Sequence, residues 1–221
     1  MKAIVYTKYG PPDVLQVREV DKPSPRDNEV LVRVEAASVN ALDYRRFEMQ
    51  SSMGHFMDSV LLKVIGKTLG ADIAGRVEAV GIGVKQFKPG DEVFGQSKGA
   101  AGAFAEYACA GENELALKPA NVSFEAAAAT PVAALTALQA LRDKGRIQSG
   151  QQVLINGASG GVGTFAVQLA KSLGAEVTAV CSTRNLDMAR KIGADHVIDY
   201  TKDDFTKNAQ RYDLIAAVNG N

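Results

Sequence analysis

Residues 152–163 read QVLINGASGGVG, an apolar segment followed directly by a turn that contains four glycines. The apolar part, 152–156, is typical of a buried strand, and the pattern from Gly161 to Leu173 predicts a helix. Glycine lets the backbone turn sharply, and the amino end of a helix offers free N–H groups and a positive dipole to an anion. This strand–turn–helix order predicts a dinucleotide fold whose turn binds a pyrophosphate. The alternative is a tight turn that binds no ligand.

Apolar strands alternate with helices after this turn. Strands are predicted at 176–180, 196–199 and 213–218, with helices at 186–192 and near 203–209. Such alternation is typical of a parallel sheet built from strand–helix–strand units. Only four of the six strands of a complete dinucleotide fold are counted, so we expect a partial Rossmann sheet. Its strand 213–218 would then form an open edge, and we expect self-association through it.

The first half of the chain has a different period. Short segments of alternating apolar and polar residues, separated by turns rich in Gly and Pro, predict a β-barrel or sandwich. These segments are 3–8, 15–20, 29–39, 75–81, 91–95 and 103–108. Residues 45–69 are interpreted as a loop or short helix, and an alanine-rich helix is expected from Ser123 to Lys144. The expected domains are therefore 1–122 and 123–221, in an α/β chain.

The end of the second predicted strand bears on the choice of cofactor. A carboxylate there would bind the ribose hydroxyls of NAD, but the chain has Ser182, Thr183 and Arg184 instead. A guanidinium pairs with phosphate, and the two hydroxyls can donate to it. These residues predict NADP(H) rather than NAD(H). The alternative is that Arg184 only begins a helix at the surface.

Composition excludes several classes of protein. The 25 basic residues equal the 25 acidic ones, which argues against a nucleic-acid or anionic-membrane partner. Two cysteines are too few for a disulfide framework or a four-thiolate zinc site. The sequence shows neither the apolar run of a signal peptide nor one long enough to span a membrane. We therefore expect a soluble, cytoplasmic protein.

Five motifs along the chain resemble the zinc-free, quinone-oxidoreductase-like branch of the medium-chain dehydrogenase/reductase superfamily. They are ASVN at 37–40 with Asp43, GAD at 70–72 with Gly75, PGDEV at 89–93, GAFAEY at 102–107 and GASGGVG at 157–163. The resemblance implies a GroES-like β-barrel domain followed by a Rossmann domain, with the active site in the cleft between them.

The resemblance also bears on metal binding. Zinc-dependent members of the superfamily ligate the metal with two cysteines and a histidine, and the matching positions here look like Asn40, Ala71 and Pro131. None of these side chains suits Zn²⁺, so we expect no metal site.

Without zinc, the resemblance implies hydride transfer from NADPH to a small-molecule quinone or α,β-unsaturated carbonyl. It implies that Asn40 and Tyr44 lie beside the nicotinamide, where Tyr44 could donate a hydrogen bond or proton. The alternative for Tyr44 is packing at the edge of the barrel. Asp43 is expected to orient a neighbour, and Asp72 to form a structural ion pair.

The expected cofactor-binding residues come from several segments of the second half. Tyr200 resembles a residue that stacks beside the adenosine 2′-phosphate, with ordinary burial as the alternative. The full set is Thr136, Ser159, Gly160, Gly161, Val162, Gly163, Ser182, Thr183, Arg184, Tyr200 and Asn219. Two other functions remain open at this point: a truncated nucleotide-binding module with little or no turnover, and a relative of the zinc alcohol dehydrogenases.

Overall fold

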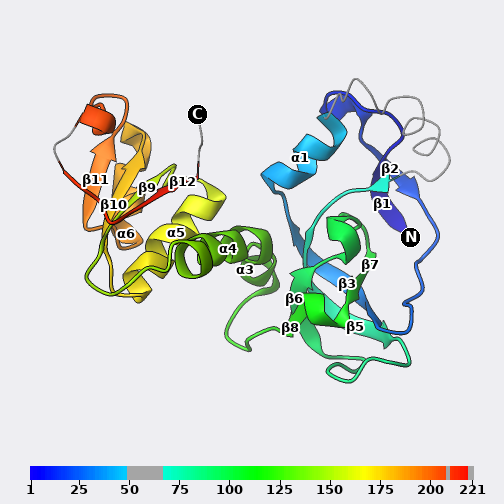
Figure 1. Cartoon of the computed structure of the whole chain (residues 1–221). Coiled ribbons are helices and arrows are strands. Elements are labelled where there is room, and N and C mark those ends of the chain that lie inside the picture. Colours follow the sequence, from blue (N-terminus) through cyan, green and yellow to red (C-terminus); the bar gives the residue numbers. More distant parts are fainter. Residues whose placement is uncertain (49–66, 208–209, 219–221) are drawn as a thin grey trace. The chain divides into compact units, whose positions relative to one another are not determined.

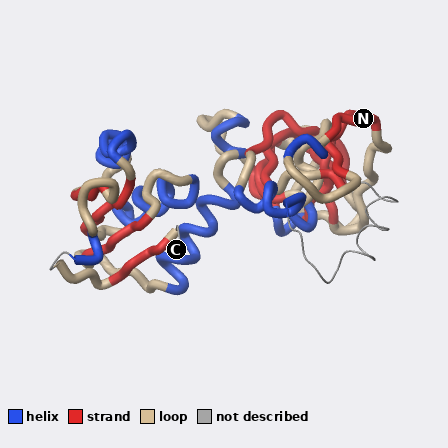
Figure 2. Tube along the Cα trace, turned by 90° about the horizontal axis from the view of Figure 1, so that it is seen from above, coloured by secondary structure: helices blue, strands red, loops and turns tan. Residues whose placement is uncertain are grey.

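The computed structural model describes residues 1–48, 67–207 and 210–218 of the chain (Figure 1). Contacts between Cα atoms divide the chain into two compact units, Met1–Val132 and Ala133–Asn221. Strands dominate the first unit, whereas helices alternate with strands in the second (Figure 2). The domain limits expected from the change in sequence period, 1–122 and 123–221, stay a prediction.

Among its described residues, the first unit contains two antiparallel sheets, as expected for the GroES-like barrel. One has the strand order β2-β1-β4 and the other β7-β3-β5-β6-β8, and a single bridge pairs Ala3 with Ala105. The strands are β1 (Lys2–Tyr6), β2 (Gln16–Glu19), β3 (Glu29–Ser38), β4 (Lys67–Thr68), β5 (Asp72–Val80), β6 (Glu92–Gln96), β7 (Tyr107–Gly111) and β8 (Leu115–Leu117).

Alternation along the strands builds the core of this unit. Val30 and Val32 of β3 are fully buried, and Ile73 of β5 and Val93 of β6 pack in the same cluster. The strand expected at 103–108 is wrong in position, because β7 begins only at Tyr107. Residues 102–104 instead turn against the segment before β5, where the N–H groups of Gly102 and Phe104 both donate to the Leu69 carbonyl.

The second unit contains the parallel sheet that the sequence predicts. Its strand order is β11-β10-β9-β12, which is 3-2-1-4 in chain order and matches one end of the dinucleotide-binding arrangement. The strands are β9 (Gln152–Asn156), β10 (Glu176–Cys181), β11 (His196–Asp199) and β12 (Leu214–Ala217), and the helices α5 (Gly161–Ser172) and α6 (Leu186–Lys191) lie between them in the chain. Self-association through β12 stays a prediction, as does the expectation that two further strands are missing.

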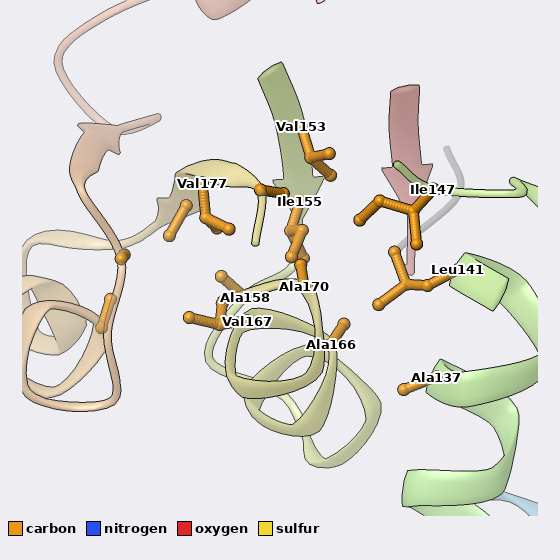
Figure 3. Close-up of a cluster of buried hydrophobic side chains, with 14 of the residues drawn as sticks. Ala137, Leu141, Ile147, Val153, Ile155, Ala158, Ala166, Val167, Ala170 and Val177 are labelled. Atoms are coloured by element: carbon orange, nitrogen blue, oxygen red, sulfur yellow. The ribbon is translucent and has the colours of Figure 1, made fainter. Parts of the chain in front are cut away.

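Small residues on α5 allow this helix to pack closely on the sheet. Figure 3 shows Ala166, Val167 and Ala170 of α5 beside Ile155 of β9. All four side chains are almost fully buried. The glycine-rich turn therefore joins two elements that are held rigidly against each other.

The single alanine-rich helix expected from Ser123 to Lys144 is wrong, because the chain forms three helical segments there. They are α3 (Phe124–Ala128), α4 (Pro131–Leu138) and a π-helical segment (Gln139–Lys144). Proline has no N–H to continue the first helix, but its fixed φ suits the first position of the next one. Ser123 caps α3, because its Oγ accepts a hydrogen bond of 3.2 Å from the N–H of Ala126.

Helix α1 spans Ala41–Glu48 in the first unit. Its residues 45–48 overlap the segment 45–69, for which the sequence predicts a loop or short helix. Residues 49–66 of that segment fall outside the described residues. No helix in the part of the chain that the structure describes is long and apolar enough to cross a lipid bilayer.

Candidate cofactor and active site

The glycine-rich turn is fastened to the end of the neighbouring strand. The N–H groups of Gly157 and Ala158 both donate to the carbonyl of Val180 in β10, at 3.2 and 3.1 Å. Gly157 has a φ of +85°, which L side chains rarely adopt, and its carbonyl accepts from the N–H of Gly160 at 3.1 Å. These bonds hold the turn in a fixed shape at the carboxyl ends of β9 and β10.

The glycines of the turn differ in what a side chain would meet. A Cβ at Gly163 would lie 2.1 Å from the Gly157 carbonyl oxygen, so this glycine is required by the close approach of α5 to the turn. A Cβ at Gly160 or Gly161 would meet nothing closer than 3.5 Å. The glycines at 160 and 161 are both exposed, so they leave backbone uncovered at the start of α5.

The amino end of α5 has the donors that a pyrophosphate needs. Gly160 is its N-cap and supplies no side-chain bond, and the helical ladder begins with the Thr164 N–H donating to the Gly160 carbonyl at 2.9 Å. Helix geometry therefore leaves the N–H groups of 161–163 without an intrahelical acceptor. Ser159 lies before them in the turn, and its side chain and that of Val162 are half-buried. Bare backbone, free donors and a helix dipole together fit the diphosphate of a dinucleotide.

The residues predicted for the adenosine end lie together beyond β10. Ser182 precedes a single 3-10 turn, Thr183–Asn185, and its Oγ accepts from the Asn185 side-chain amide at 3.1 Å. Arg184 in that turn is exposed and forms no ion pair with the described residues. Tyr200 follows β11 and is 57% exposed, so the alternative of ordinary burial is wrong.

One functional candidate in this region was missed from the sequence. Asp199 ends β11 directly beside Cys181, and its Oδ2 accepts a hydrogen bond of 2.5 Å from the Thr183 hydroxyl. Its other oxygen accepts from the hydroxyl of Thr201 at 2.7 Å and from the Thr201 N–H at 3.1 Å. The only signal for it in the sequence is an acidic residue at the end of an apolar strand.

A second cluster lies in the first unit, around the fully buried carboxylate of Asp72. Its Oδ2 accepts hydrogen bonds of 3.0 Å from both the Ser38 hydroxyl and the Asn40 side-chain amide. The N–H of Val132, in the first turn of α4, lies 3.1 and 3.2 Å from its two oxygens. Asp72 forms hydrogen bonds here, and no ion pair of Asp72 occurs among the described residues, which corrects the expected structural ion pair.

These bonds fix the orientation of the predicted catalytic residue Asn40. Its Nδ2 donates to Asp72 and, at 3.2 Å, to the Ser38 Oγ, so its amide oxygen points away from both. The backbone N–H of Asn40 donates to Asp43 at 2.7 Å, so Asp43 orients this neighbour at the start of α1. Burial is the largest influence on Asp72 and raises the pKa of its carboxyl, against the lowering effect of its three donors.

The other predicted residues fall as follows. Tyr44 of α1 is 43% exposed, and Thr136 of α4 is exposed. Asn40 and Tyr44 belong to the first unit, and Thr136 belongs to the second with the glycine turn and the adenosine-end residues. The predicted cofactor residue Asn219 lies outside the described residues.

The expectation that the chain has no zinc site stays a prediction. Within residues 1–48, 67–207 and 210–218, no three His, Cys, Asp or Glu side chains converge as a metal site would require. Asp72, which follows Ala71 in the chain, already accepts hydrogen bonds from three donors, one of them Asn40.

Two protein families match the chain. Residues 26–120 match the alcohol dehydrogenase GroES-like domain, and residues 161–213 match the family described as zinc-binding dehydrogenase. The second name refers to that family as a whole, and the residues described above do not supply its metal ligands.

Curated relatives match over most of this chain. A chloroplastic quinone-oxidoreductase homolog of Spinacia oleracea is 43% identical over 90% of the chain and 61% of its own length. The 2-methylene-furan-3-one reductase of Solanum lycopersicum is 39% identical over 97% of the chain and 56% of its own. The mitochondrial NAD(P)H oxidoreductase RTN4IP1 of Mus musculus is 40% identical over 91% of the chain and 54% of its own. The chain thus spans little more than half the length of these relatives.

Solved structures agree with the fold. The quinone oxidoreductase from Coxiella burnetii superimposes with a TM-score of 0.89 and 35% identity, covering 100% of this chain and 69% of that one. The Escherichia coli quinone oxidoreductase complexed with NADPH superimposes with a TM-score of 0.80 and 35% identity, covering 92% of this chain and 60% of that one.

The comparisons also correct one expectation. The cytoplasmic location expected from composition is wrong by this measure, because relatives that match this chain are chloroplastic or mitochondrial proteins. An ordinary globular composition does not distinguish these compartments, which is why composition could not locate the protein.

Proposed function

Because this chain belongs to the quinone-oxidoreductase-like branch of the medium-chain dehydrogenase/reductase superfamily, we propose that it acts as an NADPH-dependent oxidoreductase. The acceptor in this proposal is a small quinone or an α,β-unsaturated carbonyl. Relatives named as quinone oxidoreductases and as an alkenal/one oxidoreductase support that class of acceptor.

The observation that carries the proposal is the bare turn between β9 and α5. Its backbone is uncovered at 160 and 161, and three consecutive N–H groups follow at the start of a helix that is packed rigidly on the sheet. Such donors are already oriented before the anion arrives, so binding costs little reorganisation. An NADPH-complexed structural neighbour with the same fold supports a nicotinamide cofactor at this turn.

Preference for NADPH over NADH is a further part of the proposal. Arg184 is exposed at the turn after β10 and has no acidic partner among the described residues, so its guanidinium is available to a 2′-phosphate. An arginine near the end of the second strand is how dinucleotide folds accommodate that phosphate.

The chain's own residues would orient the acceptor. Bound NADPH supplies the hydride. Asn40 has its amide nitrogen held by Asp72 and Ser38, so its oxygen is oriented to accept a hydrogen bond from a ligand. The half-exposed phenol of Tyr44 would donate a hydrogen bond or proton to the acceptor. The proposal includes no role for zinc, and this is supported by the lack of three converging His, Cys, Asp or Glu side chains among the described residues.

Cofactor binding is tested with Gly160→Ala. A Cβ at 160 has room in the folded chain, so we expect wild-type stability but at least about tenfold weaker NADPH binding, because the methyl group covers the anion site. Ser172→Ala, at the other end of α5, is the matched control and should bind as wild type does. Fluorescence titration with NADPH gives the affinities. Equal affinity of Gly160→Ala and wild type would refute this site.

Turnover distinguishes this proposal from the second candidate, a nucleotide-binding module without catalysis. NADPH oxidation is followed with a quinone and, separately, with an enone as acceptor. Acceptor-dependent oxidation that falls in Tyr44→Phe supports the reductase, whereas tight binding with no oxidation supports the module.

A further inference from the structure

A buried carboxylate lies beside the turn after β10, which is where dinucleotide folds bind the adenosine ribose. The second strand, β10, ends without an acidic residue, but Asp199 of the adjacent strand β11 is in register with Cys181 at that end. Asp199 is 6% exposed, and it accepts a 2.5 Å hydrogen bond from Thr183 in the turn after β10. The third strand therefore brings negative charge to a place where the second strand has none.

The carboxylate is ionised at neutral pH. Hydrogen bonds from Thr183 and Thr201 are the main causes that hold the pKa of Asp199 below its ordinary value, and they outweigh the effect of burial. Lys202 is the only cation that pairs with it among the described residues, at 3.8 Å, and its side chain is largely exposed. The negative charge is thus only weakly compensated.

The same bond restricts what Thr183 can offer a ligand. A hydroxyl has one proton, and that of Thr183 is donated to Asp199, whose ionised oxygens can only accept. The Thr183 oxygen can still accept a hydrogen bond, and it lies 3.1 Å from the Thr201 hydroxyl. A ribose 2′-hydroxyl can donate to such an oxygen, whereas a 2′-phosphate, which carries nearly two negative charges at neutral pH, cannot.

We propose that Asp199 is a specificity-determining residue that acts through Thr183 to favour the 2′-hydroxyl of NADH over the 2′-phosphate of NADPH. It opposes Arg184, which favours the phosphate. The preference of the wild-type protein for NADPH is therefore smaller than Arg184 alone would produce. This inference rests on the proposed dinucleotide function and refines its cofactor choice.

The test compares affinities for the two cofactors in the same variant. Asp199→Asn removes the charge and keeps the volume, and we expect the ratio of NADPH affinity to NADH affinity to rise by about threefold or more. Asp199→Ser removes the charge with a smaller side chain and serves if the asparagine variant does not fold, as judged by circular dichroism. Thr201→Val is the matched control, because it removes a donor to the same carboxylate and keeps the charge.

Each outcome assigns the failure to one proposal. A raised ratio in the charge-removing variants, with an unchanged ratio in Thr201→Val, supports the inference. A ratio that stays the same or falls in Asp199→Asn or Asp199→Ser overturns it, even if both cofactors bind. If wild-type protein binds neither cofactor in the fluorescence titration, the proposed function itself fails. If Asp199 has only a structural role, its replacement will weaken the binding of both cofactors equally and leave the ratio unchanged, which also overturns the inference.

Discussion

Gly163→Ala should destabilise the second unit because the new methyl group has no room. Its Cβ would lie 2.1 Å from the Gly157 carbonyl oxygen and 2.8 Å from the Ala158 Cα, and both are backbone atoms that cannot rotate away. Folded proteins essentially never place a Cβ closer than 3.0 Å to such an atom. Helix α5 or the turn must therefore move by roughly 1 Å in a close-packed region.

The magnitude follows from two opposing effects. Overpacking of this kind costs about 1–3 kcal/mol, and replacing glycine with alanine inside a helix returns up to about 1 kcal/mol. Because the obstructing atoms belong to the backbone, we expect an overpacking cost of about 3 kcal/mol and a net loss of unfolding free energy of about 2 kcal/mol. For a domain of about 90 residues, that loss lowers the midpoint of thermal unfolding by about 8–16 °C.

Gly161→Ala is the matched control in the same helix. The nearest atom to its Cβ would be the Ala133 Cβ at 3.8 Å, an ordinary contact, so the unfolding free energy should stay unchanged or rise by up to about 1 kcal/mol. Urea and thermal unfolding followed by circular dichroism give both values. If the two variants unfold alike, the close approach of α5 to the turn is not what requires glycine at 163.

Three further predictions concern stability. Burial raises the pKa of the Asp72 carboxyl, so the native state keeps the carboxyl proton at pH values where the unfolded chain releases it. The resulting contribution to stability is complete below about pH 3.9, the ordinary pKa, and is lost as the pH rises through the raised pKa of the native state. The difference in unfolding free energy between wild type and Asp72→Asn should therefore fall as pH rises above about 4. Urea unfolding midpoints of the two proteins, measured over a pH series, would contradict this if they differed by the same amount at every pH. Val167→Ala, at a fully buried position under the sheet, should lower the unfolding free energy by about 1–3 kcal/mol in urea titrations, and a smaller loss would mean that the core readily collapses around the cavity. Ser123→Ala should cost about 1 kcal/mol through loss of the α3 cap, whereas Ser123→Asp should restore most of it in the same assay.

Local pattern was sufficient for the nucleotide-binding fold. The strand–turn–helix order around Gly157 and the periodicity of the following segments predicted the parallel sheet, and β9 and β11 have the expected bounds. The break at Pro131 was missed because alanine-rich composition favours a helix on both sides, and only the missing proline N–H separates them. The late start of β7 depends on hydrogen bonds to Leu69, which no short window of sequence reveals.

The sequence predicted which residues belong to the candidate site better than it predicted their hydrogen-bond partners. The sequence identified Thr183 as a donor to phosphate, but it could not show that Asp199, 16 residues away, takes up that proton. It placed Asp72 in an ion pair, and the structure shows three uncharged donors from separate segments. In both cases strand register and tertiary packing decide which side chain meets which carboxylate.

The shared carboxylate in the first unit has a consequence for how this chain tolerates change. Ser38, Asn40 and the backbone at Val132 all depend on one side chain, so replacing any of them alters the surroundings of the other two. Substitutions at Ser38 and Asn40 should therefore be epistatic, with a combined effect that differs from the sum of the separate ones. Sequence drift at these positions is expected to be correlated, because a neutral change at one depends on what occupies the others.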